Sequence, residues 1–157
     1  MSSQSEIYAF IDAVKTRLTT NTATIGSPTV YERDDKPFKV ADGTMELPIL
    51  YVIPLADAGD DIDMQWNTNS LEHDFKFSIL GYYEAAVADL NSSAGLTQRR
   101  LILGYLFNIV DLFKGTGAFI TSGNIYSASL EQGYFDDKGV IVAGGIITFS
   151  VKLFTNT

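Results

Sequence analysis

The chain has 157 residues, 11 of them basic and 19 acidic, which gives a formal net charge of −8 at pH 7. Its length and its apolar content of 46% predict a single domain over residues 1–157 with its own hydrophobic core. The acidic balance argues against a protein that grips nucleic acid, because such binding depends on Lys and Arg to neutralise phosphates. There is no membrane-length apolar run and no basic leader, so we expect no membrane partner. The chain has no cysteine, which excludes disulfides and thiol nucleophiles and is typical of a soluble protein from a reducing compartment.

The first predicted element is a helix, because the apolar residues from Ile7 to Leu18 follow the spacing of one buried stripe. Ser3 and Glu6 have the spacing of a capping box, in which each side chain bonds the other residue's free backbone N–H. The charged residues that fall off the stripe are expected to face water: Asp12, Lys15 and Arg17.

Two strands and a long connection follow in the prediction. Residues 29–32 form a short strand, and residues 49–53, fenced by Pro48 and Pro54, form a central strand covered on both faces. Residues 56–74 are acidic and polar and are expected to be a long surface connection.

The remaining elements are a strand, a helix and a hairpin. Phe75, Phe77 and Ile79 alternate with polar residues, which predicts a strand. A second helix is expected to begin near Thr97. The C-terminal part reads as a β-hairpin that turns within residues 135–139. The predicted fold class is α+β: a mostly antiparallel or mixed sheet with two α-helices packed on one face. Two pairs of glycines are expected to shape these elements: Gly115 and Gly117 end the second helix, and Gly144-Gly145 place a bulge or bend in the last strand.

The sequence contains no motif that supports a catalytic function. His73, the sole histidine, is followed by Asp74, but no nucleophile elbow accompanies them, so we interpret His73 as a surface or edge residue. Four aspartates do not match the EF-hand pattern and are interpreted as a solvated acidic loop: Asp57, Asp60, Asp61 and Asp63. We therefore predict no enzyme, no catalytic residue, no cofactor and no metal.

Two groups of residues are candidates for contacts between subunits. Arg99 and Arg100 are expected in the first turn of the second helix, exposed to solvent or, alternatively, paired with acids of a neighbouring subunit. Tyr134 and Phe135 lie beside the hairpin turn. Neighbouring residues of a strand point to opposite faces, so the core can accept at most one of these two rings. The turn residues Asp136 and Asp137 complete the candidate interface.

The order of elements resembles that of tail-terminator (tail-completion) proteins of long-tailed bacteriophages. An amphipathic helix is followed by LPILYVIPL, an acidic linker, HDFKFSILGYY, TQRRLILGYLFNIVDLF and the hairpin GYFDDKGVIVAGGIITFSVKLF. The resemblance implies a virion protein, assembled in the host cytoplasm, that forms a ring, usually a hexamer. Such a ring caps the tail tube, contacts the tail tube protein and presents a surface to head-completion and neck proteins. The long 56–74 connection departs from the family.

The net charge fits this role, because an acidic lumen would let DNA slide through without specific binding. The four aspartates named above are the candidate lumen or rim acids. Two alternatives remain open. One is another neck or head-completion connector, which would share the size and acidity. The other is a small cytosolic ligand-binding or enzymatic domain, which would need a deep pocket with converging polar groups.

Overall fold

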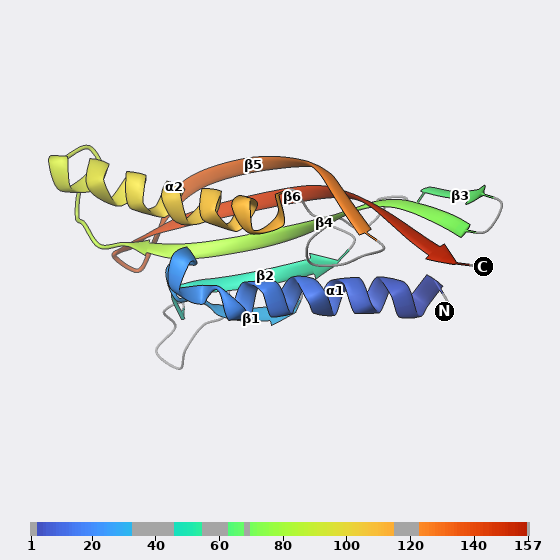
Figure 1. Cartoon of the computed structure of the whole chain (residues 1–157). Helices are drawn as coiled ribbons and strands as arrows, with labels where there is room; N and C mark the ends of the chain where they lie inside the picture. Colours follow the sequence, from blue (N-terminus) through green and yellow to red (C-terminus); the bar gives the residue numbers. More distant parts are fainter. Residues whose placement is uncertain (1–2, 33–45, 55–62, 68–69, 115–122, 157) are drawn as a thin grey trace.

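The computed structural model describes residues 3–32, 46–54, 63–67, 70–114 and 123–156. The elements are α1 (Ser3–Thr20), a 3-10 helix η1 (Thr22–Ile25), β1 (Thr29–Glu32), β2 (Ile49–Pro54), β3 (Asp63–Asn67), β4 (Ser70–Ala85), α2 (Ser93–Phe113), β5 (Gly123–Asp137) and β6 (Val140–Asn156). The sheet order is β1-β2-β4-β6-β5, and β3 pairs with the first residues of β4. Strands β1 and β2 are parallel, and the other neighbours are antiparallel. The long strands run the length of the molecule, and the two chain ends lie at the same end as β3 (Figure 1).

The core lies between the two helices and one face of the sheet, which we call the inner face. Alternate residues of β4, among them Phe75 and Phe77, point to this face and pack with Phe149 of β6. The ring of Phe10 from α1 meets the edges of Phe75 and Phe77 at centroid distances of 5.8 and 5.6 Å. Phe113 from α2 meets Phe149 at 5.2 Å. The predicted α+β architecture, with both helices on one sheet face, is confirmed.

A pair of glycines lets α2 approach the sheet closely. Gly81 of β4 and Gly145 of β6 are partners in the register, and both are buried beneath Leu106 of α2. A Cβ on Gly145 would lie 2.9 Å from Leu106 Cδ1, closer than real Cβ contacts come. Leu106 therefore occupies space that a side chain at position 145 would need.

The bulge predicted at Gly144-Gly145 is wrong, because the pairing of β6 with both neighbours runs unbroken through these residues. The register shift of this hairpin falls instead between Ile125 and Ser127 of β5. The glycines make room for neighbouring side chains, which a sequence pattern does not distinguish from a backbone irregularity.

The start of α2 differs from the prediction, whereas the capping box predicted at the start of α1 is not tested. Helix α2 begins about one turn before Thr97, because the Ser92 hydroxyl caps it by accepting the Gly95 N–H at 3.0 Å. Ser3 is the first residue of α1, and its side chain is not described, so the capping box stays a prediction. Gly115 and Gly117 lie outside the described residues.

The expectation that the charged residues of α1 face water holds for Asp12, holds in part for Lys15 and is wrong for Arg17. Arg17 is half-buried, and its Nε donates to the Leu112 carbonyl at 3.1 Å. Helix α1 packs beside the end of α2, so this bond satisfies one of the carbonyls that a helix leaves free at its C-terminus. The Lys15 side chain is also half-buried, with Nζ 4.0 Å from the Glu32 carboxylate.

Within the long surface connection predicted over residues 56–74, the described residues 63–67 and 70–74 form two paired strands. Strand β3 pairs antiparallel with β4, which begins at Ser70. His73 is the register partner of Leu153 in β6 and is 1% exposed, so its assignment to the surface is wrong. Leu71, His73 and Phe75 alternate in phase, and this pattern continues the strand backwards from the segment that the sequence analysis used.

Candidate functional site

A row of aromatic rings crosses the face of the sheet that the helices leave uncovered, which we call the outer face. Tyr31, Tyr51, Tyr82 and Phe135 come from β1, β2, β4 and β5 in that order. Successive ring centroids are 6.0, 6.5 and 6.0 Å apart. The row begins with Tyr31 beside the buried Tyr51 and ends with the exposed Phe135. The outer face therefore carries apolar surface out to the hairpin edge.

This row ends in a shallow depression of about 380 Å³. Phe135 and Ile146 are 41% and 42% exposed there. Gly144 has no side chain to fill the depression, whereas a Cβ at this position would lie 3.4 Å from the Tyr82 ring. We call this depression the outer groove and define it by Leu80, Tyr82, Glu131, Gly133, Phe135, Gly144 and Ile146.

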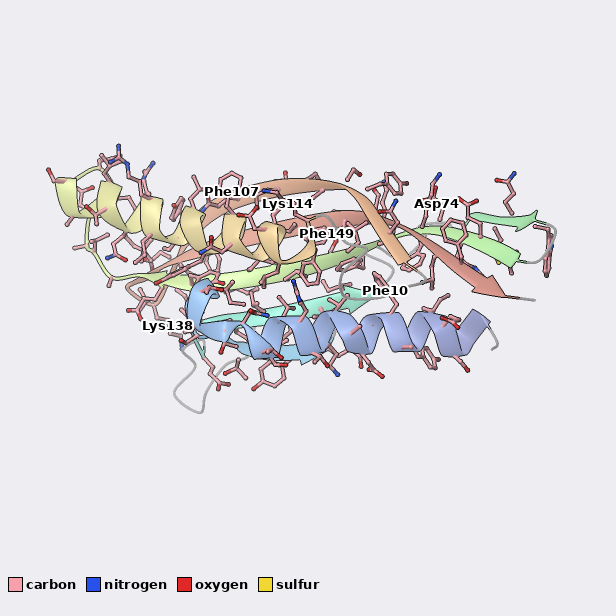
Figure 2. All side chains as sticks on the ribbon, viewed as in Figure 1. Phe10, Asp74, Phe107, Lys114, Lys138 and Phe149 are labelled. Atoms are coloured by element: carbon pink, nitrogen blue, oxygen red, sulfur yellow. The ribbon has the colours of Figure 1, made fainter. Side chains whose placement is uncertain are left out.

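Helix α2 carries a second exposed apolar surface. Leu96, Leu103 and Phe107 are spaced by seven and four residues, so they line up along one side of the helix. This side is separate from the buried line that includes Leu106 and Phe113. Phe107 is 53% exposed on α2, and Lys114 is the C-cap of the same helix (Figure 2). We call these three residues the α2 stripe.

The two surfaces carry opposite charge. Helix α2 and its C-cap contain Arg99, Arg100 and Lys114 against one acid, Asp111, which lies 3.7 Å from the Lys114 ammonium. Strand β5, at the edge of the sheet beside the outer groove, contains three acids and no basic residue. The β5 acids are Glu131, Asp136 and Asp137.

The hairpin aromatics divide between the two faces as predicted. Tyr134 is half-buried against the core, and the Arg99 guanidinium lies over its ring at 5.4 Å. Phe135 points to the outer face and stays exposed. Asp136 Oδ1 accepts the Gly139 N–H at 3.0 Å, so this acid closes the hairpin turn.

The two arginines also divide. Both lie in the second turn of α2 because the helix begins at Ser93, which corrects their assignment to the first turn. Arg99 is half-buried on Tyr134 and is not the solvated side chain expected, whereas Arg100 is exposed. The cation–π contact gives Arg99 a role within the subunit.

The candidate lumen acids are mostly outside the described residues. This applies to Asp57, Asp60 and Asp61, while Asp63 is the first residue of β3 and its side chain is not described. Their place relative to a lumen stays a prediction.

Burial lowers the pKa of His73, which favours its neutral form. Within the described ranges, no group of three His, Asp or Glu residues could hold a metal ion. Neither α1 nor α2, the helices of the described part, is long and apolar enough to cross a membrane.

The fold of this chain is similar to chains of solved structures. No protein-family model matches the chain, and no curated protein matches it. A chain of a solved structure described as "Virion of native gene transfer agent (GTA) particle" is similar to 90% of this chain and 93% of its own length. The sequence identity is 10% and the TM-score is 0.47.

Sequence reasoning missed the α2 stripe and a pair of exposed residues on β3. Met64 and Trp66 are 63% and 72% exposed, and they were read as part of a loop. The α2 stripe had a readable signal: Leu103 and Phe107 add apolar positions beyond the width of one buried face. An apolar side of a helix is normally covered by another part of the protein or by a partner. In the described structure the α2 stripe is exposed.

Proposed function

We propose that this chain is a structural subunit of a tailed-phage virion and acts as a tail terminator. Copies close into a ring, most simply a hexamer, that caps the tail tube and joins it to the neck. The role is structural and not enzymatic. The observation that carries the proposal is that both layers of the sandwich, the α2 helix and the outer sheet face, present apolar surface to solvent.

These two surfaces are unlike each other, and this favours a ring over a dimer. A contact between different patches is head-to-tail, and it closes into a ring when its rotation divides a full turn. Because the α2 helix and the outer sheet face lie on opposite layers of the sandwich, a two-fold dimer would cover only one of them and leave the other exposed on both copies. Exposed apolar patches of this kind typically mark protein–protein contacts.

The charge supports the same role. A subunit with a net charge of −8 repels DNA phosphates, so a ring of such subunits lets a genome pass without holding it. Within this proposal the acids at 57, 60, 61 and 63 rim the lumen. The tail tube protein contacts one face of the ring, and head-completion proteins contact the other.

Deletion of the gene from its parent phage tests the function. We expect filled heads and unjoined tails with an open upper end, and plasmid expression of the chain should restore joining. Loss of another neck connector would instead leave capped tails of normal length. Normal infectious particles after deletion would refute the proposal.

A further inference from the structure

We infer that neighbouring copies in the proposed ring meet by seating the α2 stripe of one copy in the outer groove of the next. This inference rests on the proposed function, because it names the partner of both surfaces as a second copy of this chain. Leu103 and Phe107 are the central residues of the convex side, and Phe135 and Ile146 are those of the concave side.

The contact must be between copies, because the sheet separates the two surfaces within one chain. Helix α2 packs on the inner face through Leu106, which lies against Gly145. The outer groove opens on the opposite face, where residues of the other parity point. One copy therefore exposes a ridge on one layer and a groove on the other.

The groove has room for an incoming side chain. A Cβ placed on Gly133 would meet no heavy atom within 4 Å, and one on Gly144 would reach only ordinary contact distance from the Tyr82 and Phe135 rings. A leucine or phenylalanine from the stripe can therefore contact both aromatic rings without displacing them. Aromatic residues in such pockets are typical anchors of protein interfaces.

Charge complementarity selects a second copy in this arrangement. Helix α2 with its C-cap has two exposed basic residues, Arg100 and Lys114, and one acid, whereas β5 with the turn residue Lys138 has three acids and one basic residue. Two stripes in contact would bring together two helices with an excess of basic residues, and two grooves in contact would bring together two acidic β5 strands. Like charges at an interface oppose these symmetric pairings, so stripe against groove is the favoured contact.

Cross-linking with introduced cysteines tests the contact directly, because the chain contains no cysteine of its own. The test variant is Leu103→Cys with Glu131→Cys, which keeps the Phe107 anchor and leaves the groove at Gly133 open. The matched control is Leu101→Cys with Glu131→Cys. Leu101 is 45% exposed on the same helix but lies two residues, or about 200°, around it from Leu103. Both proteins are assembled on tail tubes and treated with a short bismaleimide.

We expect the test variant to give a covalent ladder that ends at the number of subunits in the ring, and the control to give single chains. Terminal rings that form but cross-link no better than the control would overturn this inference and leave the proposed function standing. Tube ends that carry no ring with the unmodified protein would overturn the proposed function itself.

A second variant probes the groove without touching α2. Gly133→Leu fills the groove at a position where the fold has open space, and Lys76→Leu adds the same side chain at an exposed position of β4 outside the groove. We expect Gly133→Leu to reduce ring assembly by about tenfold, the effect of losing one anchor contact, and Lys76→Leu to leave it unchanged. Equal assembly by the two variants, with both melting like the parent protein, would contradict the inference.

Discussion

The close approach of α2 to the sheet predicts that Gly145 and Leu106 are energetically coupled. In Gly145→Ala the new methyl carbon would lie 2.9 and 3.0 Å from the two Leu106 methyl carbons. Leu106 is 1% exposed and has little room to move. We expect this overpacking to cost about 1–3 kcal/mol of the free energy of unfolding, whereas Gly133→Ala, with open space at its Cβ, should be neutral or stabilising by up to about 1 kcal/mol.

The reverse change enlarges the same space. Leu106→Ala removes buried methyl groups and should cost about 2–5 kcal/mol. In the double variant, the methyl group added at position 145 occupies part of the space vacated at position 106. The double variant should therefore be more stable than the sum of the single effects predicts, by about 1–2 kcal/mol.

Urea unfolding followed by far-UV circular dichroism measures this cycle. For a chain of this length, 1 kcal/mol corresponds to about 2–4 °C in Tm, so the single variants are also resolved by thermal melting. Equal stabilities of Gly145→Ala and Gly133→Ala, or strictly additive effects in the double variant, would refute the packing described for α2.

Three further stability predictions rest on buried polar groups. Tyr83→Phe removes the hydroxyl that donates to the Ile25 carbonyl at 2.8 Å and should cost about 1–2 kcal/mol in urea unfolding; no loss would contradict the bond. Arg17→Met keeps the apolar stem but loses the bond to Leu112, so thermal melting should show a loss of about 1 kcal/mol, against no change for the exposed Arg100→Met. Burial lowers the pKa of His73, so the unfolded chain binds a proton at this residue more tightly than the folded chain. The contribution of neutral His73 to the free energy of unfolding is therefore present above about pH 6.5 and is lost as the pH falls below it. His73→Leu should flatten this part of the pH profile of unfolding, and an unchanged profile would contradict the assignment.

The architecture could be predicted because the periodicities of the core elements are clear. The stripe from Ile7 to Leu18 and the alternation of Phe75, Phe77 and Ile79 each identify an element and its buried face. The same alternation rule placed Tyr134 and Phe135 on opposite faces. Such patterns depend on neighbours within one element, and the sequence displays these directly.

The parts that failed depend on contacts between elements. Arg17 looks solvated on its own helix and is half-buried only because α2 ends beside it. Gly145 resembles a bulge until Leu106 is placed above it. The outer groove combines residues from β4, β5 and β6, and its existence follows from register, which a single sequence does not specify. The first residues of β4, which include His73, were assigned to a surface connection because their polar side chains outweigh their alternation.

Cryo-electron microscopy of tail tubes incubated with the purified full-length chain tests the central claim most directly. The account predicts a single closed ring at one end of each tube, most simply with six copies, in which the α2 helix of each subunit lies against the outer sheet face of its neighbour. A two-fold dimer at the tube end, or tubes whose ends carry none of this chain, would contradict it.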